Sequence, residues 1–254
     1  MKRFDAIKCI SEEILGDGLV EALFLKGSIA RNEDDEYSDV DMYAAVSTEN
    51  WEKFLEKRLS YLEKYMPLLF WTESNFVGPQ IVGVFENALH FDLYTVKVNA
   101  IPQTDEIRII YDKNGLLASY KKESLSVSSE MIIDEINEFS FTLLEFETAY
   151  KRNDFIWAIR LFYAELHRVS LITRFIYDKE NSRIGLKNLY KVIPNDFYIE
   201  INNILENATP SKILFAMKQL LKLTNKLIQE LPDDIKNQVN NKFYNLMFTK
   251  IIGI

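Results

Sequence analysis

The chain has 254 residues, 48% of them hydrophobic and 27% charged, which suits a soluble globular protein of one large or two ordinary domains. No apolar run reaches the ~18–20 residues of a membrane helix, and charges interrupt the apolar part of the N-terminal segment, so neither a membrane span nor an export signal is expected. Cys9 is the only cysteine, which excludes an intramolecular disulfide. We therefore expect a cytoplasmic protein.

The negative charge of the chain is concentrated in its first half. Residues 1–120 hold 12 Lys and Arg against 21 Asp and Glu, a net charge of −9, whereas residues 121–254 hold 18 against 17, a net charge of +1. An acidic surface repels phosphate backbones, so a nucleic-acid partner is disfavoured. Metal ions or a cationic small molecule would be attracted to this half.

The first half alternates helix-like and strand-like segments. Apolar residues at helical spacing predict helices at 4–15 and 47–66, and Gly16, Gly18 and Pro67 mark their ends. Short apolar segments bounded by Gly, Pro or Asn predict strands at 19–27, 40–46, 68–73, 80–86, 89–98 and 106–112. We expect a mixed, twisted sheet with helices on one side.

The second half has only helical periodicity. Helices are predicted at 128–152, 154–178, 211–231 and 233–248, and a boundary is placed near 118–127. The predicted fold class is therefore α+β: an N-terminal domain built on the mixed sheet, residues 1–120, followed by a C-terminal helical bundle, residues 121–254.

Three aspartates interrupt the predicted strands of the first half. Asp39 and Asp41 begin the strand at 40–46, and residues two apart in a strand point to the same face. Asp92 lies between the apolar residues Phe91 and Leu93. A buried carboxylate is costly unless it is compensated, and a divalent cation shared by several carboxylates provides compensation. Mg²⁺ is the expected metal.

The segment "KGSIAR" ends the strand at 19–27 and provides groups suited to phosphate. Gly27 allows a ligand to approach the backbone, and Ser28 can begin a short helix whose free N–H groups suit an anion. Arg31 lies one turn further on, and Lys26 directly precedes the glycine. Phosphates held here opposite metal-binding carboxylates would form a nucleotidyl-transfer site.

The combined motif "GSIAR…YSDVD" resembles the signature of the polymerase-beta-like nucleotidyltransferase superfamily, Gly-Ser-x-Ala-Arg followed by Ser-Asp-x-Asp at this spacing. Among its members the lincosamide nucleotidyltransferases look nearest, because "LHFDLYTVKVNAIP" and "IRIIYDKNGLLASY" are similar to segments of those enzymes; the aminoglycoside adenylyltransferases come next. The resemblance covers about the first 120 residues.

The resemblance implies a reaction and a set of roles. An NTP bound with Mg²⁺, most simply ATP, would give its NMP to a hydroxyl of a small molecule and release pyrophosphate. Asp39 and Asp41 would hold the metals, and Asp92 would share the second metal and act as general base. The backbone of Gly27 and the hydroxyl of Ser28 would hold the terminal phosphates.

Other residues at this site keep more than one interpretation. Ser38 could support the phosphate loop, and Asn32 stands where many relatives have glycine, which could reshape that loop. His90 could share the face of Asp92 or have a structural role. Glu145 or Glu147, in the helical half, could bind the acceptor or act as base.

Two other functions stay open beside an antibiotic-modifying enzyme. One is a protein-modifying or toxin–antitoxin nucleotidyltransferase, and the other is a non-catalytic nucleotide-binding regulator on the same fold. Acidic charge favours an aminoglycoside as acceptor, whereas the segment similarity favours a lincosamide, with the aromatic helices at 139–177 as an apolar wall. Related enzymes often form dimers, so a homodimer is also expected.

Overall fold

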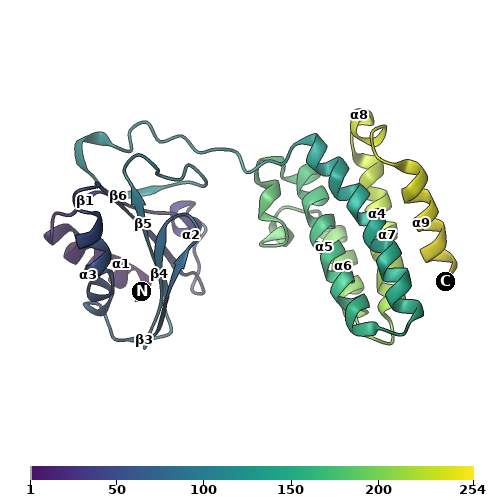
Figure 1. Ribbon diagram of the computed structural model, residues 1–254, viewed down its shortest axis with the longest axis horizontal. Helices are drawn as coiled ribbons and strands as arrows, with labels where there is room; N and C mark the ends of the chain where they lie inside the picture. The colour runs from purple at the N-terminus through teal and green to yellow at the C-terminus, as the bar shows by residue number, and fades with distance from the viewer. Residues whose placement is uncertain (1) are drawn as a thin grey trace. The chain divides into compact units, whose positions relative to one another are not determined.

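The computed structural model describes residues 2–254, and the chain divides into two compact units, Met1–Glu123 and Ser124–Ile254 (Figure 1). The first unit is built around a six-stranded sheet, and the elements of the second unit are helices. The α+β class predicted from the sequence is therefore confirmed. Within residues 2–254, no helix has the length and apolar character that crossing a membrane requires.

The first unit contains every strand that the sequence predicts. Its elements are α1 (Lys2–Gly16), β1 (Val20–Leu25), α2 (Gly27–Ala30), β2 (Val40–Val46), α3 (Trp51–Glu63), β3 (Leu68–Asn75), β4 (Pro79–Phe85), β5 (His90–Lys97), β6 (Arg108–Asp112) and the 3-10 turn η1 (Lys113–Gly115). The strand order is β3-β4-β5-β2-β1-β6, in which β2 and β5 are parallel and the other neighbours are antiparallel.

Helices α1 and α3 cover one face of the sheet (Figure 1). Alternation along β2 sends Val40 and Met42 into this helix-covered core, together with Leu93 of β5, and all three are fully buried. The intervening residues of β2 point to the opposite face, where Tyr43 joins a smaller apolar cluster with Phe24. The carboxylates described below lie on this opposite face.

The second unit is a helical bundle with one continuous apolar core. Its elements are α4 (Ser129–Lys151), α5 (Phe155–Tyr177), η2 (Lys179–Ile184), η3 (Leu189–Lys191), α6 (Asn195–Glu206), α7 (Ile213–Glu230), α8 (Asp233–Lys236) and α9 (Asn241–Gly253). Side-chain caps begin the two longest helices: Ser128 accepts from the N–H of Met131, and Asp154 accepts from that of Trp157.

Two features of the bundle differ from the sequence prediction. The helix expected at 233–248 is interrupted, because Asn240 caps a new helix by accepting from the N–H of Phe243 at 3.2 Å. Helix α6 was not predicted, although Pro194 before its first turn and Asp196 within that turn are ordinary helix-start residues.

Candidate active site

The parallel pairing of β2 with β5 brings two of the three predicted aspartates together. Asp41 and Asp92 are register partners on neighbouring strands, so both carboxylates project from the same face of the sheet. Asp39 precedes β2 by one residue and is two residues from Asp41, on the side of His90. The two strands thus place on one face all three aspartates that the sequence singled out.

The side chain of His90 lies between two of these carboxylates. Its Nε2 is 3.0 Å from Oδ1 of Asp92, and its Nδ1 is 3.6 Å from Oδ2 of Asp39. Within residues 2–254, no three His, Cys, Asp or Glu side chains are grouped so that they could hold a metal ion. In this arrangement the imidazole of His90 contacts one oxygen of Asp92 and one oxygen of Asp39.

Asp92 is the most enclosed of the carboxylates. Its side chain is 10% exposed, compared with 40% for Asp39. Burial raises the pKa of Asp92, and His90 and a hydrogen bond from Gln80 act in the opposite direction. Oε1 of Gln80 is also buried and has no hydrogen-bond partner among the described residues. An unsatisfied acceptor beside a costly carboxylate is a place where a cation with its water ligands, or a hydroxyl, would be stabilised.

Two stacked tyrosines lie on the same face of the sheet as the carboxylates. The rings of Tyr43 and Tyr94, register partners on β2 and β5, are 4.2 Å apart and nearly parallel, and Phe24 stacks on the far side of Tyr43. Burial raises the pKa of both tyrosines, and the negative charges of Asp41 and Asp92 raise it further. These tyrosines therefore stay protonated in a negative field that favours cations.

Gly27 begins α2 and lies directly against Asp41. Its φ is +67°, in the left-handed region, and a Cβ at this position would lie 2.3 Å from Oδ2 of Asp41. The backbone N–H of Lys26 also bonds to the carbonyl of Asp41 at 3.0 Å. Position 27 therefore requires glycine both for its conformation and for space. The segment predicted to bind phosphate, residues 26–31, which we call the phosphate loop, is thus in direct contact with a carboxylate predicted to bind metal.

The loop that joins α2 to β2 consists of turns and irregular segments that local hydrogen bonds hold. Asn32 has a φ of +56°, a conformation that glycine adopts readily and that asparagine tolerates better than most residues. Asparagine can therefore form the same turn at this position, where many relatives have glycine. The hydroxyl of Ser38 accepts from the N–H of Asp35 at 3.0 Å and donates to its carboxylate at 3.1 Å. Ser38 thus closes this loop through Asp35.

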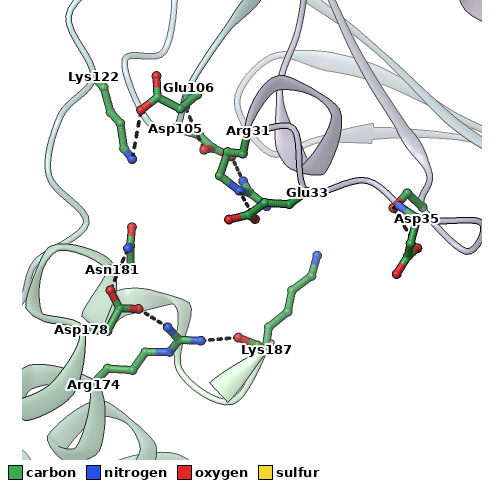
Figure 2. Close-up of polar contacts among 11 residues, drawn as sticks. Arg31, Glu33, Asp35, Asp105, Glu106, Lys122, Arg174, Asp178, Asn181 and Lys187 are labelled. Carbon is green, nitrogen blue, oxygen red and sulfur yellow. Dashed lines mark hydrogen bonds and ion pairs between the residues drawn. The ribbon is translucent and has the colours of Figure 1, made fainter. Parts of the chain in front are cut away.

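The two cations beside the loop are both engaged. Lys26 is 4% exposed, and its ammonium donates to the carbonyls of Pro102 at 2.5 Å and Thr104 at 2.6 Å. Burial lowers its pKa to about 8. Arg31 forms ion pairs with Glu33 and Asp105, as Figure 2 shows. Although burial lowers the pKa of Arg31, its hydrogen bonds to these carboxylates raise it by more.

The glutamates proposed in the helical unit have different surroundings. Glu147 is 5% exposed and accepts from Lys151 at 2.6 Å, and its other oxygen is 2.7 Å from the ammonium of Lys250. These hydrogen bonds, that of Lys151 first, lower its pKa. Glu147 therefore links α4 to α9, and both of its carboxylate oxygens contact lysines of its own unit. Glu145 is exposed.

Sequence reasoning missed several residues of this face. The stacking of Tyr43 on Tyr94 and the bond from Gln80 to Asp92 depend on strand register, which the sequence did not specify. One pattern could have found the tyrosines. Each lies two residues after an aspartate, in "DMY" and "DLY", and so points to the same face.

Comparisons with known proteins give similarities in structure, two of which are described below. No protein-family model matches the chain, and no curated protein matches it. An aminoglycoside 6-adenyltransferase from Bacillus subtilis is similar over 96% of this chain and 97% of its own, with 14% identity and a TM-score of 0.33. A nucleotidyltransferase-like protein from Exiguobacterium sibiricum is similar over 97% of this chain and 77% of its own, with 16% identity and a TM-score of 0.34. Likeness at this level assigns no activity by itself, so the function must be argued from the site.

Proposed function

We propose that the protein is a Mg²⁺-dependent nucleotidyltransferase that moves NMP, most simply AMP from ATP, to a hydroxyl of a small molecule. One observation carries the proposal: Asp41 and Asp92 are partners in the β2–β5 register, and the backbone of Gly27 lies against Asp41. A metal held by the carboxylates would therefore lie beside the loop that is proposed to hold phosphates. That adjacency is what transfer of a metal-bound phosphoryl group requires.

The donor chemistry fits a hard divalent cation. Carboxylate oxygens are the ligands that Mg²⁺ uses in proteins, usually with substrate phosphates and water completing its shell. Asp39, Asp41 and Asp92 would hold it, and the bound ion would neutralise charge on the reacting phosphate. His90 contacts one oxygen of Asp39 and one of Asp92, so a metal ion that used these two oxygens would require the imidazole to turn away.

Asp92 is proposed to accept the proton of the acceptor hydroxyl. Its raised pKa moves it toward the range in which a carboxylate is an effective base, and its buried position keeps it close to the sheet. The backbone of Gly27 and the hydroxyl of Ser28 are proposed to position the β- and γ-phosphates. Arg31 would reach the same phosphates after leaving its present carboxylate partners.

The helical unit is proposed to bind the acceptor and to form a homodimer. Aromatic side chains on α4 and α5 remain about half exposed, namely Phe141, Trp157 and Tyr163. Exposed aromatic rings suit both the apolar part of a drug and a protein interface. Light scattering at micromolar concentration tests the dimer, and a mass of about 30 kDa, that of the single 29.8 kDa chain, would contradict it.

The acceptor is proposed to be a lincosamide-like or aminoglycoside-like antibiotic. The test is incubation with Mg-ATP and a panel of lincomycin, clindamycin and several aminoglycosides, followed by pyrophosphate measurement and mass spectrometry. The expected result is an acceptor whose mass rises by one AMP residue, with one pyrophosphate released for each adduct. Absence of an adduct on every member, with ATP binding demonstrated, would contradict this acceptor class.

A non-catalytic nucleotide-binding regulator is the second candidate. The observation that favours it is the pairing of the site's own groups, because His90 contacts two carboxylates and Arg31 is held by two others. Pyrophosphate release with any member of that panel would exclude the regulator. A regulator would bind Mg-ATP and release no pyrophosphate with any acceptor or protein substrate.

A further inference from the structure

A short segment on the carboxylate side of the first unit is tied to both cations that flank the phosphate loop. We call residues 102–105 the strap. Lys26 donates to the carbonyls of two strap residues, Pro102 and Thr104, and Arg31 pairs with the carboxylate of a third, Asp105. Lys26 and Arg31 lie on either side of Gly27-Ser28 in the sequence. The strap therefore touches the loop at both of its ends.

The pair between Arg31 and Asp105 is the tie that a ligand could reach. Lys26 is 4% exposed and lies over the rings of Tyr43 and Tyr120, so its ammonium is enclosed. The side chains of Arg31 and Asp105 are 26% and 22% exposed. Figure 2 shows the guanidinium of Arg31 directed at Glu33 on one side and at Asp105 on the other.

Asp105 is held in an unfavourable backbone conformation. Its φ is +74°, which side chains other than glycine rarely adopt. Three contacts offset this strain. The Asp105 carboxylate pairs with Arg31 and accepts from the N–H of Glu106 at 2.8 Å, and the Asp105 carbonyl accepts from the hydroxyl of Tyr120 at 2.8 Å. Loss of the ion pair would therefore loosen the strap.

Guanidinium groups bind carboxylates and phosphates through the same planar arrangement of N–H donors. Glu33 accepts from Nε of Arg31 and Asp105 accepts from Nη1, so the two carboxylates compete with any phosphate that would bind these donors. Glu33 is two residues from Arg31 and half exposed, so it can turn into solvent at little cost, whereas Asp105 lies 74 positions away on a separate segment. Of the two ion pairs of Arg31, the one with Asp105 connects the loop to the strap.

On the basis of the function proposed above, we propose that Asp105 competes with the phosphates of the nucleotide for Arg31, so that binding of the triphosphate opens the Arg31–Asp105 pair and releases the strap from Arg31. Asp105 is then the residue that sets nucleotide affinity. Its carboxylate lowers the affinity for triphosphate in the ligand-free state and makes the strap responsive to nucleotide.

The test compares Asp105→Asn with Glu106→Gln. Each variant removes one negative charge from adjacent positions, but Glu106 is exposed and is paired with Lys122 at 3.5 Å rather than with Arg31 (Figure 2). Asparagine tolerates a positive φ and can still accept from the N–H of residue 106, so Asp105→Asn should fold. Calorimetry measures the dissociation constants for Mg-ATP and for Mg-tripolyphosphate.

We expect Asp105→Asn to bind both probes at least about fivefold more tightly than the wild type, and Glu106→Gln to stay within about twofold, as the loss of one competing ion pair predicts. Equal or weaker binding by Asp105→Asn than by Glu106→Gln would overturn the inference and leave the proposed function standing. Failure of all three proteins to bind either probe would overturn both.

Hydrogen exchange provides a second test on the unmodified protein. The amide of Glu106 bonds to the Asp105 carboxylate, and the amide of Glu123 bonds to the carbonyl of Gln103 in the strap at 2.8 Å. If nucleotide releases the strap, Mg-ATP should accelerate exchange at these two amides while it slows exchange in the phosphate loop. Slower or unchanged exchange at both amides, with ATP bound, would overturn the inference.

Discussion

The two faces of the sheet in the first unit are made by neighbouring residues of the same strands, yet they have opposite properties. On the helix-covered face, Val40, Met42 and Leu93 are 0% exposed in an apolar core. On the other face, Asp41 and Asp92 lie near the stacked rings of Tyr43 and Tyr94, and the ammonium of Lys26 lies over the ring of Tyr43. A shift of one residue in register would exchange the two faces, so the hydrophobic face fixes where the carboxylates lie.

The helix-covered face is expected to contribute mainly to folding stability, and the opposite face mainly to the proposed reaction. The helix-covered face supplies apolar burial, which is the main stabilising contribution to folding. The opposite face gathers carboxylates whose charged forms are disfavoured by burial, as the raised pKa of Asp92 indicates. Substitutions on the two faces should therefore affect different measurements, and adjacent residues of β2 provide matched pairs.

The largest effect is expected at Asp41. Asp41→Asn should lower the rate of pyrophosphate release by about a thousandfold, because a neutral amide is a poor ligand for Mg²⁺ and the change lies beside the phosphate loop. The control is Glu36→Gln, which removes the same charge from an exposed position of the preceding loop and should keep the wild-type rate. Comparable rates in the two variants would contradict a role for Asp41 in the reaction.

Asp92→Asn should lower the same rate by about a hundredfold or more, since it removes the proposed general base. Mg-ATP binding, measured by calorimetry, should survive because Gly27, Ser28 and the other two carboxylates remain. Turnover at the wild-type level would rule Asp92 out both as base and as metal ligand.

Met42→Ala tests the opposite face. Met42 is fully buried next to Asp41 in the sequence, and its truncation should lower the free energy of unfolding by about 2–5 kcal/mol. At temperatures where the variant stays folded, its affinity for Mg-ATP should equal that of the wild type. Denaturant unfolding measures the first quantity. A large loss of ATP affinity without a loss of stability would contradict the assignment of folding stability to this face and of ligand binding to the opposite face.

Lys26 gives a smaller effect that depends on pH. Its pKa is about 8 in the folded protein and about 10.4 in an unfolded chain, so the unfolded state binds more protons between these values. The cost of burying the ammonium is fully present below about pH 8 and is relieved as the pH rises. Wild-type stability relative to Lys26→Met should therefore rise by about 2 kcal/mol between about pH 7.5 and 9.5. A flat difference across this range would contradict the pKa of Lys26.

The sequence predicted the strands, the glycine turn and the shared face of Asp39 and Asp41, because these depend on local periodicity and on the special properties of glycine. It did not predict the His90 bridge, since that contact requires knowing that β5 pairs with β2 in parallel and in which register. The ion pair of Arg31 with Asp105 was not predicted either. Its partner Asp105 comes from a turn 74 positions away, and no local pattern connects them.

The same limit applied to the helical unit. Glu147 looked like a candidate acceptor ligand in the sequence, but packing of α9 on α4 brings Lys250 to it and makes it an internal ion pair. The break between α8 and α9 depends on the capping bond of Asn240, which competes with continued helical periodicity. The sequence thus predicted that Glu147 lies on a helix, but only the long-range packing of α9 on α4 determines which residues it contacts.

Mg²⁺-dependent ATP binding is the most direct test of the proposal that the carboxylate face holds a metal beside the phosphate loop. Calorimetry would compare wild type, Asp41→Asn and Met42→Ala, each with Mg²⁺ and with EDTA. We expect wild type and Met42→Ala to bind ATP with equal affinity and only when Mg²⁺ is present, and Asp41→Asn to bind at least about tenfold more weakly. Wild-type affinity in Asp41→Asn, or tight binding in EDTA, would contradict the proposal.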